Sequence, residues 1–136
     1  MVGKEILGSA KVVVGLPPAS RSSDGSGDTV DTQGYEAVMV SFLVGDVSGT
    51  ISLTPELLES DSSTTGFTVV AAADLIGGAF TEVTGTSSDN TVQSRAYKGT
   101  KRYLRANDNR TGTSAVNTAA VFVLANPRHV PVVQVT

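Results

Sequence analysis

The chain of 136 residues has no cysteine, no tryptophan and few aromatic residues. Without cysteine it can form neither disulfides nor thiolate metal sites, so packing or partner subunits must stabilise the fold. No stretch approaches the ~18 apolar residues of a membrane-spanning helix. Glu5 and Lys11 interrupt the apolar N-terminal stretch, which excludes a signal-type core. We therefore expect a protein that stays in the cytoplasm of the cell that makes it and that does not act in a membrane.

Charged residues are also scarce, at 17% of the chain, and small Ser, Thr, Gly and Ala residues take their place. Such a composition favours short strands joined by many turns over long helices. Alternating apolar segments recur along the chain, separated by polar turns. The sequence predicts an all-β fold, an antiparallel β-sandwich or jelly roll of about seven or eight short strands.

The clearest strands are predicted at residues 35–45, 49–54, 67–70, 91–97, 101–106 and 116–125. The first has apolar residues on both faces, which predicts a central strand covered on both sides. Pro55 is expected to end or bend the second strand, residues 71–80 to contain one helical turn, and residues 107–114 to form a loop. The expected core residues are Val40, Phe42, Phe67, Leu104 and Phe122.

Residues 1–34 look different from the rest of the chain. Val12, Val13 and Val14 form a short apolar run, Pro17 and Pro18 favour extended backbone, and a Ser/Gly/Asp tract follows. That tract cannot bury enough apolar area to fold alone. We therefore expect an extended N-terminal arm at residues 1–34 and a β-sandwich domain with a short C-terminal tail at residues 35–136.

The net charge of −3 is unevenly distributed. Residues 1–90 carry three basic and twelve acidic side chains, whereas residues 91–136 carry seven basic and one acidic. Two explanations are open. Acidic and basic strands are neighbours within one fold, or oppositely charged faces meet between copies or against a charged partner.

No pattern of catalytic residues is present. The one histidine, His129, lies in the C-terminal tail, and no Gly-x-Ser-x-Gly motif exposes a serine nucleophile. Glu56, Glu59 and Asp61 are close in sequence, but a Ser-rich turn indicates solvated carboxylates rather than a glycosidase pair. We therefore expect no enzymatic activity and no cofactor.

Two segments resemble binding motifs only in part. Asp24, Asp28 and Asp31 resemble part of a calcium loop, but the closing bidentate Glu is missing, so a solvated acidic loop is favoured. Basic residues at 98–110 alternate with Tyr97 and Tyr103, as in some single-strand nucleic-acid sites. A sequence pI near 5.0 argues against a nucleic-acid partner.

Several segments, in order, resemble a family of small virion proteins of tailed bacteriophages: LPPASR, VDTQGYEAVMVSFLVG, LLESDSS with FTVVAAADLIGGAF, YKGTKRYLRA and VLANPRHVP. The resemblance implies a structural protein at the capsid surface of a virion, made in the host cytoplasm. Its implied role is capsid decoration or cementing. Its implied partners are the major capsid protein and further copies of itself, with a trimer as one arrangement. A structural role at the neck or tail is the alternative.

A second likeness connects LLESDSSTTGFTVV and KRYLRA with discoidin-type, galactose-binding-like jelly rolls. It implies a carbohydrate-binding module as a further alternative. Those domains usually place Trp after the acidic turn, where this chain has Phe67, so only the fold is taken from this likeness.

The arm and the basic segments supply the expected assembly contacts. No metal-binding or catalytic residues are expected. The candidate contact residues are Val12, Val13, Val14, Leu16, Arg21, Lys101, Arg102, Arg105, Arg128 and His129.

Overall fold

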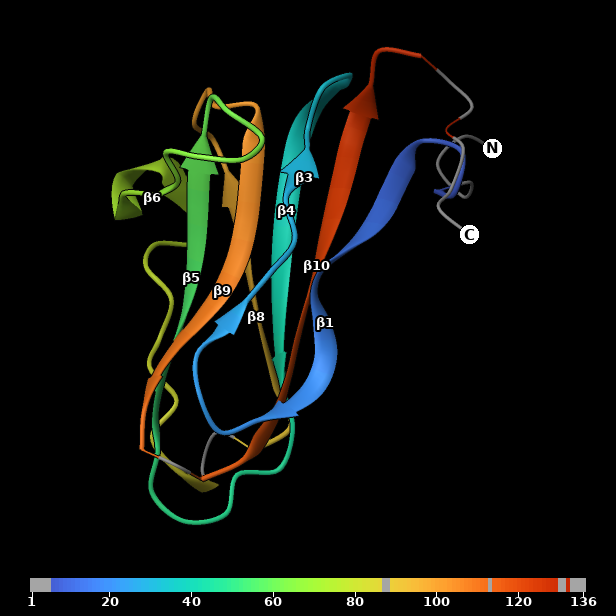
Figure 1. Ribbon diagram of the computed structural model, residues 1–136. Coiled ribbons are helices and arrows are strands. Elements are labelled where there is room, and N and C mark those ends of the chain that lie inside the picture. Colours follow the sequence, from blue (N-terminus) through green and yellow to red (C-terminus); the bar gives the residue numbers. More distant parts are fainter. Residues whose placement is uncertain (1–5, 87–88, 113, 130–131, 133–136) are drawn as a thin grey trace.

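Two antiparallel sheets pack face to face in the computed structural model, which describes residues 6–86, 89–112, 114–129 and 132 (Figure 1). Sheet A has the strand order β1-β10-β4-β8-β7, and sheet B has the order β2-β9-β5-β6, with β3 also paired to β9. Each pairing between these strands is antiparallel. The predicted all-β sandwich is confirmed.

The described residues contain ten strands, four of which have only two residues. The short 3₁₀ helix at Ala72–Asp74 matches the helical turn expected within residues 71–80. Sheet A consists of β1 (Ala10–Arg21), β4 (Tyr35–Val44), β7 (Leu75–Ile76), β8 (Thr91–Tyr97) and β10 (Val116–Pro127). Sheet B consists of β2 (Gly25–Ser26), β3 (Val30–Asp31), β5 (Ser52–Ser60), β6 (Thr68–Val69) and β9 (Tyr103–Thr111).

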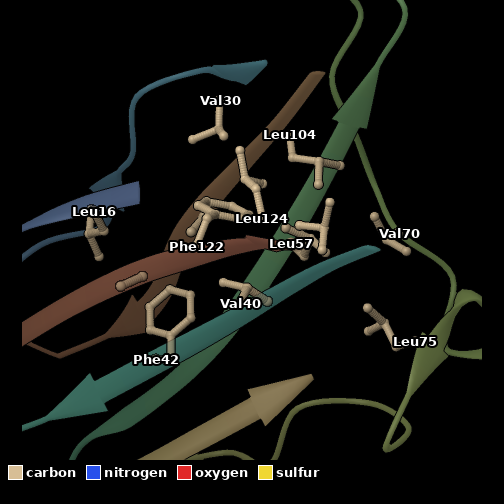
Figure 2. Close-up of a cluster of buried hydrophobic side chains, with 13 residues drawn as sticks. Leu16, Val30, Val40, Phe42, Leu57, Val70, Leu75, Leu104, Phe122 and Leu124 are labelled. Carbon is tan, nitrogen blue, oxygen red and sulfur yellow. The ribbon is translucent and has the colours of Figure 1, made fainter. Parts of the chain in front are cut away.

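The main core lies between the sheets, where alternate residues of the long strands point inward (Figure 2). Phe42 of β4 and Phe122 of β10 are its largest fully buried side chains. Leu57 of β5 and Leu104 of β9 meet them from sheet B. A second, smaller apolar cluster is made by Val44, Val47, Ile51, Leu53, Val83 and Val116. Burial of Val40, Phe42, Leu104 and Phe122 confirms four of the five expected core residues.

Phe67 is the exception, because it is only half-buried. The strand that follows it spans just Thr68–Val69, and the inward position is taken by Val70, which is buried. The Arg105 guanidinium covers the Phe67 ring at 4.0 Å from its centroid. Phe67 therefore lies at the margin of sheet B rather than in the core.

The prediction of an arm over residues 1–34, separate from a sandwich at 35–136, is wrong for residues 10–31. Strand β1 pairs with β10 from Ala10 to Arg21, and β2 and β3 pair with β9. Leu16 is fully buried in the main core, and Val30 is buried beside it. These segments bury their apolar residues against strands that lie far along the chain, so they fold as parts of the two sheets.

The predicted loop at residues 107–114 is wrong in part, and of the two alternatives for Pro55, that it ends or bends the second strand, the ending is wrong. Residues 107–111 continue strand β9 instead of starting a loop, because β5 pairs with them along Ser52–Glu56. Pro55 lies inside β5 without ending it. On the side of β5 opposite β9, the described partners are β6 at Leu58–Glu59 and a bridge at Leu53, so a proline fits between them.

Candidate docking surface

The outward side of sheet A is apolar across its whole width. Residues that face one another in the strand register point to the same side of a sheet. One such row runs through all five strands and is made by Val12, Val123, Met39, Ala96 and Ile76. We call the outward side of sheet A the apolar face.

Parallel rows extend the apolar face in both directions along the strands. Val14 and Val121 lead into a row completed by Ser41 and Ser94. The next row toward the end of β4 is made by Ala119, Leu43 and Val92, and the row at the other end by Ala10, Ala125 and Ala37.

Large side chains on the apolar face are exposed to solvent. Val92 and Ile76 are each 60% exposed, Val14 is 50% exposed, and Leu43 is 43% exposed. The expectation that the strand at residues 35–45 is covered on both sides is therefore wrong. Strand β4 is central in its sheet, but only the side bearing Val40 and Phe42 faces sheet B. A contiguous exposed apolar surface of this kind marks an interaction site.

No Asp, Glu, Lys or Arg occupies an outward position of the sheet A strands, within the residues that the structure describes. The two polar side chains near its centre satisfy each other, because the Ser41 and Ser94 hydroxyls lie 2.7 Å apart and share a hydrogen bond. Covering this face with another apolar surface would therefore leave no charge unpaired.

An open groove of about 610 Å³ lies at the Leu43 end of the apolar face. Leu43, Val92 and Ala119 form part of its wall, and Pro18 and Ala19 of β1 border it. Asn90 and Asn117 supply amide groups to its lining. The groove is therefore a depression at one end of the apolar face.

The outward side of sheet B is more polar, although Leu58 and the exposed Val69 also lie on it, and we call it the polar face. Its β5 and β9 positions pair Glu56 with Asn107 and Thr54 with Asn109. The Asn109 amide donates a hydrogen bond to the Glu56 carboxylate at 3.2 Å. The sandwich thus has one outward sheet surface suited to solvent and one suited to burial.

Of the four apolar residues predicted as assembly contacts, two point outward and two point into the fold. Val12 and Val14 point outward on the apolar face, in register with Val123 and Val121. Val13 packs against the main core and Leu16 is part of it, so the prediction that these two are contacts is wrong. A bulge between Val14 and Leu16 shifts the alternation and turns Leu16 inward.

The basic residues predicted as contacts bind within the chain itself. Lys101 lies 2.5 Å from the Asp61 carboxylate, and Arg128 lies 2.7 Å from Glu36. Arg102 makes a two-pronged pair with Asp31, with both nitrogen–oxygen distances at 2.8 Å.

The remaining predicted contacts are two arginines and the histidine. Arg105 donates to the Thr29 hydroxyl and covers Phe67. Arg21 donates to the Thr118 carbonyl at 3.0 Å and to the Pro17 carbonyl at 2.6 Å. His129 is exposed next to Arg128. With the pairs above, these contacts show acidic and basic segments as neighbours within one fold; the role of these side chains in assembly stays a prediction.

Hydrogen bonds and burial shift the pKa values of several of these groups, among them Asp31 and Tyr97. The hydrogen bond from Arg102 lowers the pKa of the Asp31 carboxyl. Burial raises the pKa of the Tyr97 hydroxyl, and its hydrogen bond to Glu59 raises it further. Both groups link separate segments: Asp31 connects β3 to Arg102, directly before β9, and Tyr97 connects β8 to β5.

The acidic loop considered for calcium is used for hydrogen bonding. The Asp24 carboxylate accepts from the Arg110 backbone N–H at 2.8 Å, and Asp31 is paired with Arg102. Among the described residues, no three His, Cys, Asp or Glu side chains are placed to hold a metal ion. The described residues likewise contain no helix that is long and apolar enough to cross a membrane.

The seven aromatic rings are occupied inside the fold. Phe42 and Phe122 are buried, Tyr35 and Tyr97 pack against the core, and three rings carry an arginine guanidinium over one face. Those stacked pairs are Arg95 on Phe80, Arg102 on Tyr103 and Arg105 on Phe67. Each of these arginines covers one face of its ring. Tyr35 and Tyr97 carry no arginine; they are partly buried and border a surface pocket of about 290 Å³.

The outward apolar residues of β4, β8 and β10 were missed as candidate contacts. The signal was present in the sequence, because Met39, Leu43 and Val121 alternate with residues of the core. From the alternation alone, this pattern predicts a second buried face. Only the strand order shows that nothing in the described chain covers them.

No protein-family model matches the chain, and no curated protein matches it. Among solved structures, it resembles the CBM22-1 xylan-binding domain from Paenibacillus barcinonensis Xyn10C, with 12% identity, 88% of each chain covered and a TM-score of 0.45. The CBM22-1–GH10 modules of Clostridium thermocellum xylanase 10B give 13% identity and a TM-score of 0.43, over 93% of this chain but 28% of that one. A Bacillus endospore appendage protein gives 11% identity and a TM-score of 0.41, over 92% and 96% of the two chains.

Proposed function

We propose that the protein is a non-enzymatic structural subunit of a virus particle, a decoration or cement protein at the capsid surface of a tailed bacteriophage. The observation that carries the proposal is the apolar face of sheet A. Monomeric proteins rarely expose contiguous apolar patches larger than a few hundred Å², and the largest patch on a monomer, typically about 300–600 Å², is often a functional contact surface. A subunit that works inside an assembly keeps such a face because assembly covers it.

The energy available from the apolar face suits repeated assembly contacts. Its rows span five strands, spaced ~4.8 Å apart, and about three steps of ~6.8 Å along them. With side-chain margins this is about 500 Å², which at ~25 cal/mol per Å² gives a gross ~12 kcal/mol. Ordering and lost rotational freedom offset much of that gain in a single contact. Many copies on one particle add their contacts by avidity.

The polar face of sheet B fits the same role. A subunit that buries the outward side of sheet A in the particle presents Glu56, Asn107 and Asn109 of sheet B to solvent. The sequence resemblance to small virion proteins supplies the capsid surface as the site of assembly. The chain has no tryptophan, and arginines cover one face of Tyr103 and Phe67, which favours the structural role over the alternative of a carbohydrate-binding module.

The test is to count this protein in purified particles by quantitative mass spectrometry, with the major capsid protein as internal standard. Hundreds of copies indicate the shell, whereas about six or twelve indicate a ring at the neck or tail. Absence from the particle would refute a structural role in it.

A second measurement tests the apolar face. Amide exchange of residues 37–44 should slow when the protein is bound to particles that lack it, compared with the free subunit kept monomeric by dilution below ~1 µM. Residues 107–111 of the polar face are the internal control. Equal exchange at residues 37–44 in both states would show that assembly does not cover the apolar face.

A further inference from the structure

We infer that the apolar face is a self-association surface, on which two copies of this chain pack sheet A against sheet A. The inference rests on the proposed function for the claim that this face is buried in use, and it names the occupant as a second copy.

The chemistry of the apolar face favours an identical partner. In a two-fold pair every side chain meets its own copy or an exchanged partner, so a single charge would be brought near its like-charged equivalent. The outward positions of β1, β4, β8 and β10 carry no charge in the described residues. A partner of a different kind would tolerate charges on this face, provided that it offered opposite ones.

The arrangement of the rows suits a two-fold axis near the centre of β4. Ser41 lies midway between Met39 and Leu43, and its hydroxyl is already satisfied by Ser94. A two-fold axis that runs parallel to the sheet and across its strands at this position places the Met39 row of one copy on the Leu43 row of the other. The open groove at the Leu43 end then faces the fully apolar row, in which Ile76 is 60% exposed. Each copy would supply both a groove and the side chains that enter it.

The size of the face matches a specific but weak dimer. About 500 Å² per copy gives about 1,000 Å² for the pair, which is the lower limit of specific interfaces. Face-to-face sheets pack ~10 Å apart with their strands ~30° off parallel. The product is a four-layer stack with both polar faces outside, and we expect a dissociation constant in the micromolar range.

The experiment is sedimentation velocity on the full chain from ~1 to ~500 µM. The wild type should shift from a 13.9 kDa monomer to a dimer of twice that mass. Leu43→Lys should weaken the dimer by at least ~100-fold, because two unpaired charges would be buried. Val92→Lys is the second variant, since the side chain it replaces is 60% exposed and the fold should tolerate it. Thr111→Lys, on the polar face, adds the same charge and should change the dissociation constant by less than ~3-fold.

The result that overturns the inference is a wild type that stays monomeric at ~500 µM, or a dimer that survives both Leu43→Lys and Val92→Lys. Loss of the dimer in Thr111→Lys alone would place the interface on sheet B and also overturn it. The proposed function fails separately. A monomeric wild type whose binding to particles is abolished by Leu43→Lys would leave the structural role standing and assign the face to another protein. If the protein forms the dimer but is absent from particles, the self-association surface stands and the proposed structural role fails.

Discussion

The buried ion pair between Asp108 and Arg110 connects the two sheets, and its contribution to the free energy of unfolding can be measured. Their side chains are 0% and 3% exposed, and Asp108 Oδ2 lies 2.5 Å from Arg110 Nη2. The same carboxylate accepts from the Thr118 hydroxyl of β10 at 2.9 Å and from the Gly25 backbone N–H of β2. Arg110 Nη1 donates to the Arg21 carbonyl of β1 at 2.5 Å. One carboxylate and one guanidinium thus link β1, β2, β9 and β10.

Replacing one partner of this pair should lower the free energy of unfolding more than replacing both. Asp108→Asn leaves the guanidinium buried without a counter-charge, which costs about 3–5 kcal/mol. Its Nε already has no hydrogen-bond partner among the described residues, so little else nearby can compensate. Arg110→Met leaves a carboxylate that keeps two donors, at a cost of about 2–4 kcal/mol. The double variant Asp108→Asn/Arg110→Met buries no charge and should lose only about 1–2 kcal/mol.

The assay is urea unfolding of the four proteins followed by circular dichroism, since the chain has no tryptophan to report on the core. The coupling energy from this double-mutant cycle should be at least ~2 kcal/mol. Asp61→Asn is the matched control, because its pair with Lys101 is 74% and 42% exposed and should contribute at most ~1 kcal/mol. If the two single losses simply add in the double variant, to within ~0.5 kcal/mol, the buried pair is not acting as a unit and the reasoning fails.

Three further changes test the fold. Phe122→Ala should lower the unfolding free energy by about 3–5 kcal/mol, whereas Phe67→Ala at the sheet margin should cost less than half of that; equal losses in urea titrations would show that Phe67 is core. Gly27→Ala should destabilise the protein, because an added Cβ would collide with the backbone carbonyl oxygens of two neighbouring strands. At Gly85 the nearest atom to an added Cβ is the Gly49 carbonyl oxygen at 4.0 Å, so Gly85→Ala is the control; similar melting temperatures would refute the close approach at Gly27. Arg102 lowers the pKa of Asp31 in the folded protein, so their pair should stabilise the folded state above pH ~4. This stabilisation should be lost as the pH falls through the lowered pKa. Asp31→Asn should flatten that part of the curve of urea midpoint against pH, and an unchanged curve would show that the pair contributes nothing.

Residues with unbroken alternation could be assigned from the sequence, and residues beside bulges could not. In β4 and β10 a strict period of two predicted that Val40, Phe42 and Phe122 point inward. In β1 the register shifts between Val14 and Leu16, and again before Ala19, so no regular pattern was visible. The paired prolines of that segment further suggested an isolated extended arm.

Strand β9 was shortened in the prediction for a different reason. Asp108 and Arg110 are charged residues in inward positions, which a sequence pattern assigns to a loop. Their partners include Gly25 and Arg21, more than 80 residues away in sequence. Local sequence cannot show that a buried charge will be matched across such a distance. For the same reason it could not separate the apolar face of sheet A from a second core face.

The pairing of the first strand with the last sets the order in which this chain can fold. Within the part of the chain that the structure describes, the strand partner of β1 is β10, and β2 and β3 pair with β9. During synthesis, the valines at 12–14 and Leu16 therefore leave the ribosome about 100 residues before the strands that pair with them. Pairings between such distant segments make folding slow and leave apolar edges open in the meantime. We expect folding rates in the range of milliseconds to seconds, and we expect a chain that ends before Val116 to leave both β1 and β4 without their shared neighbour.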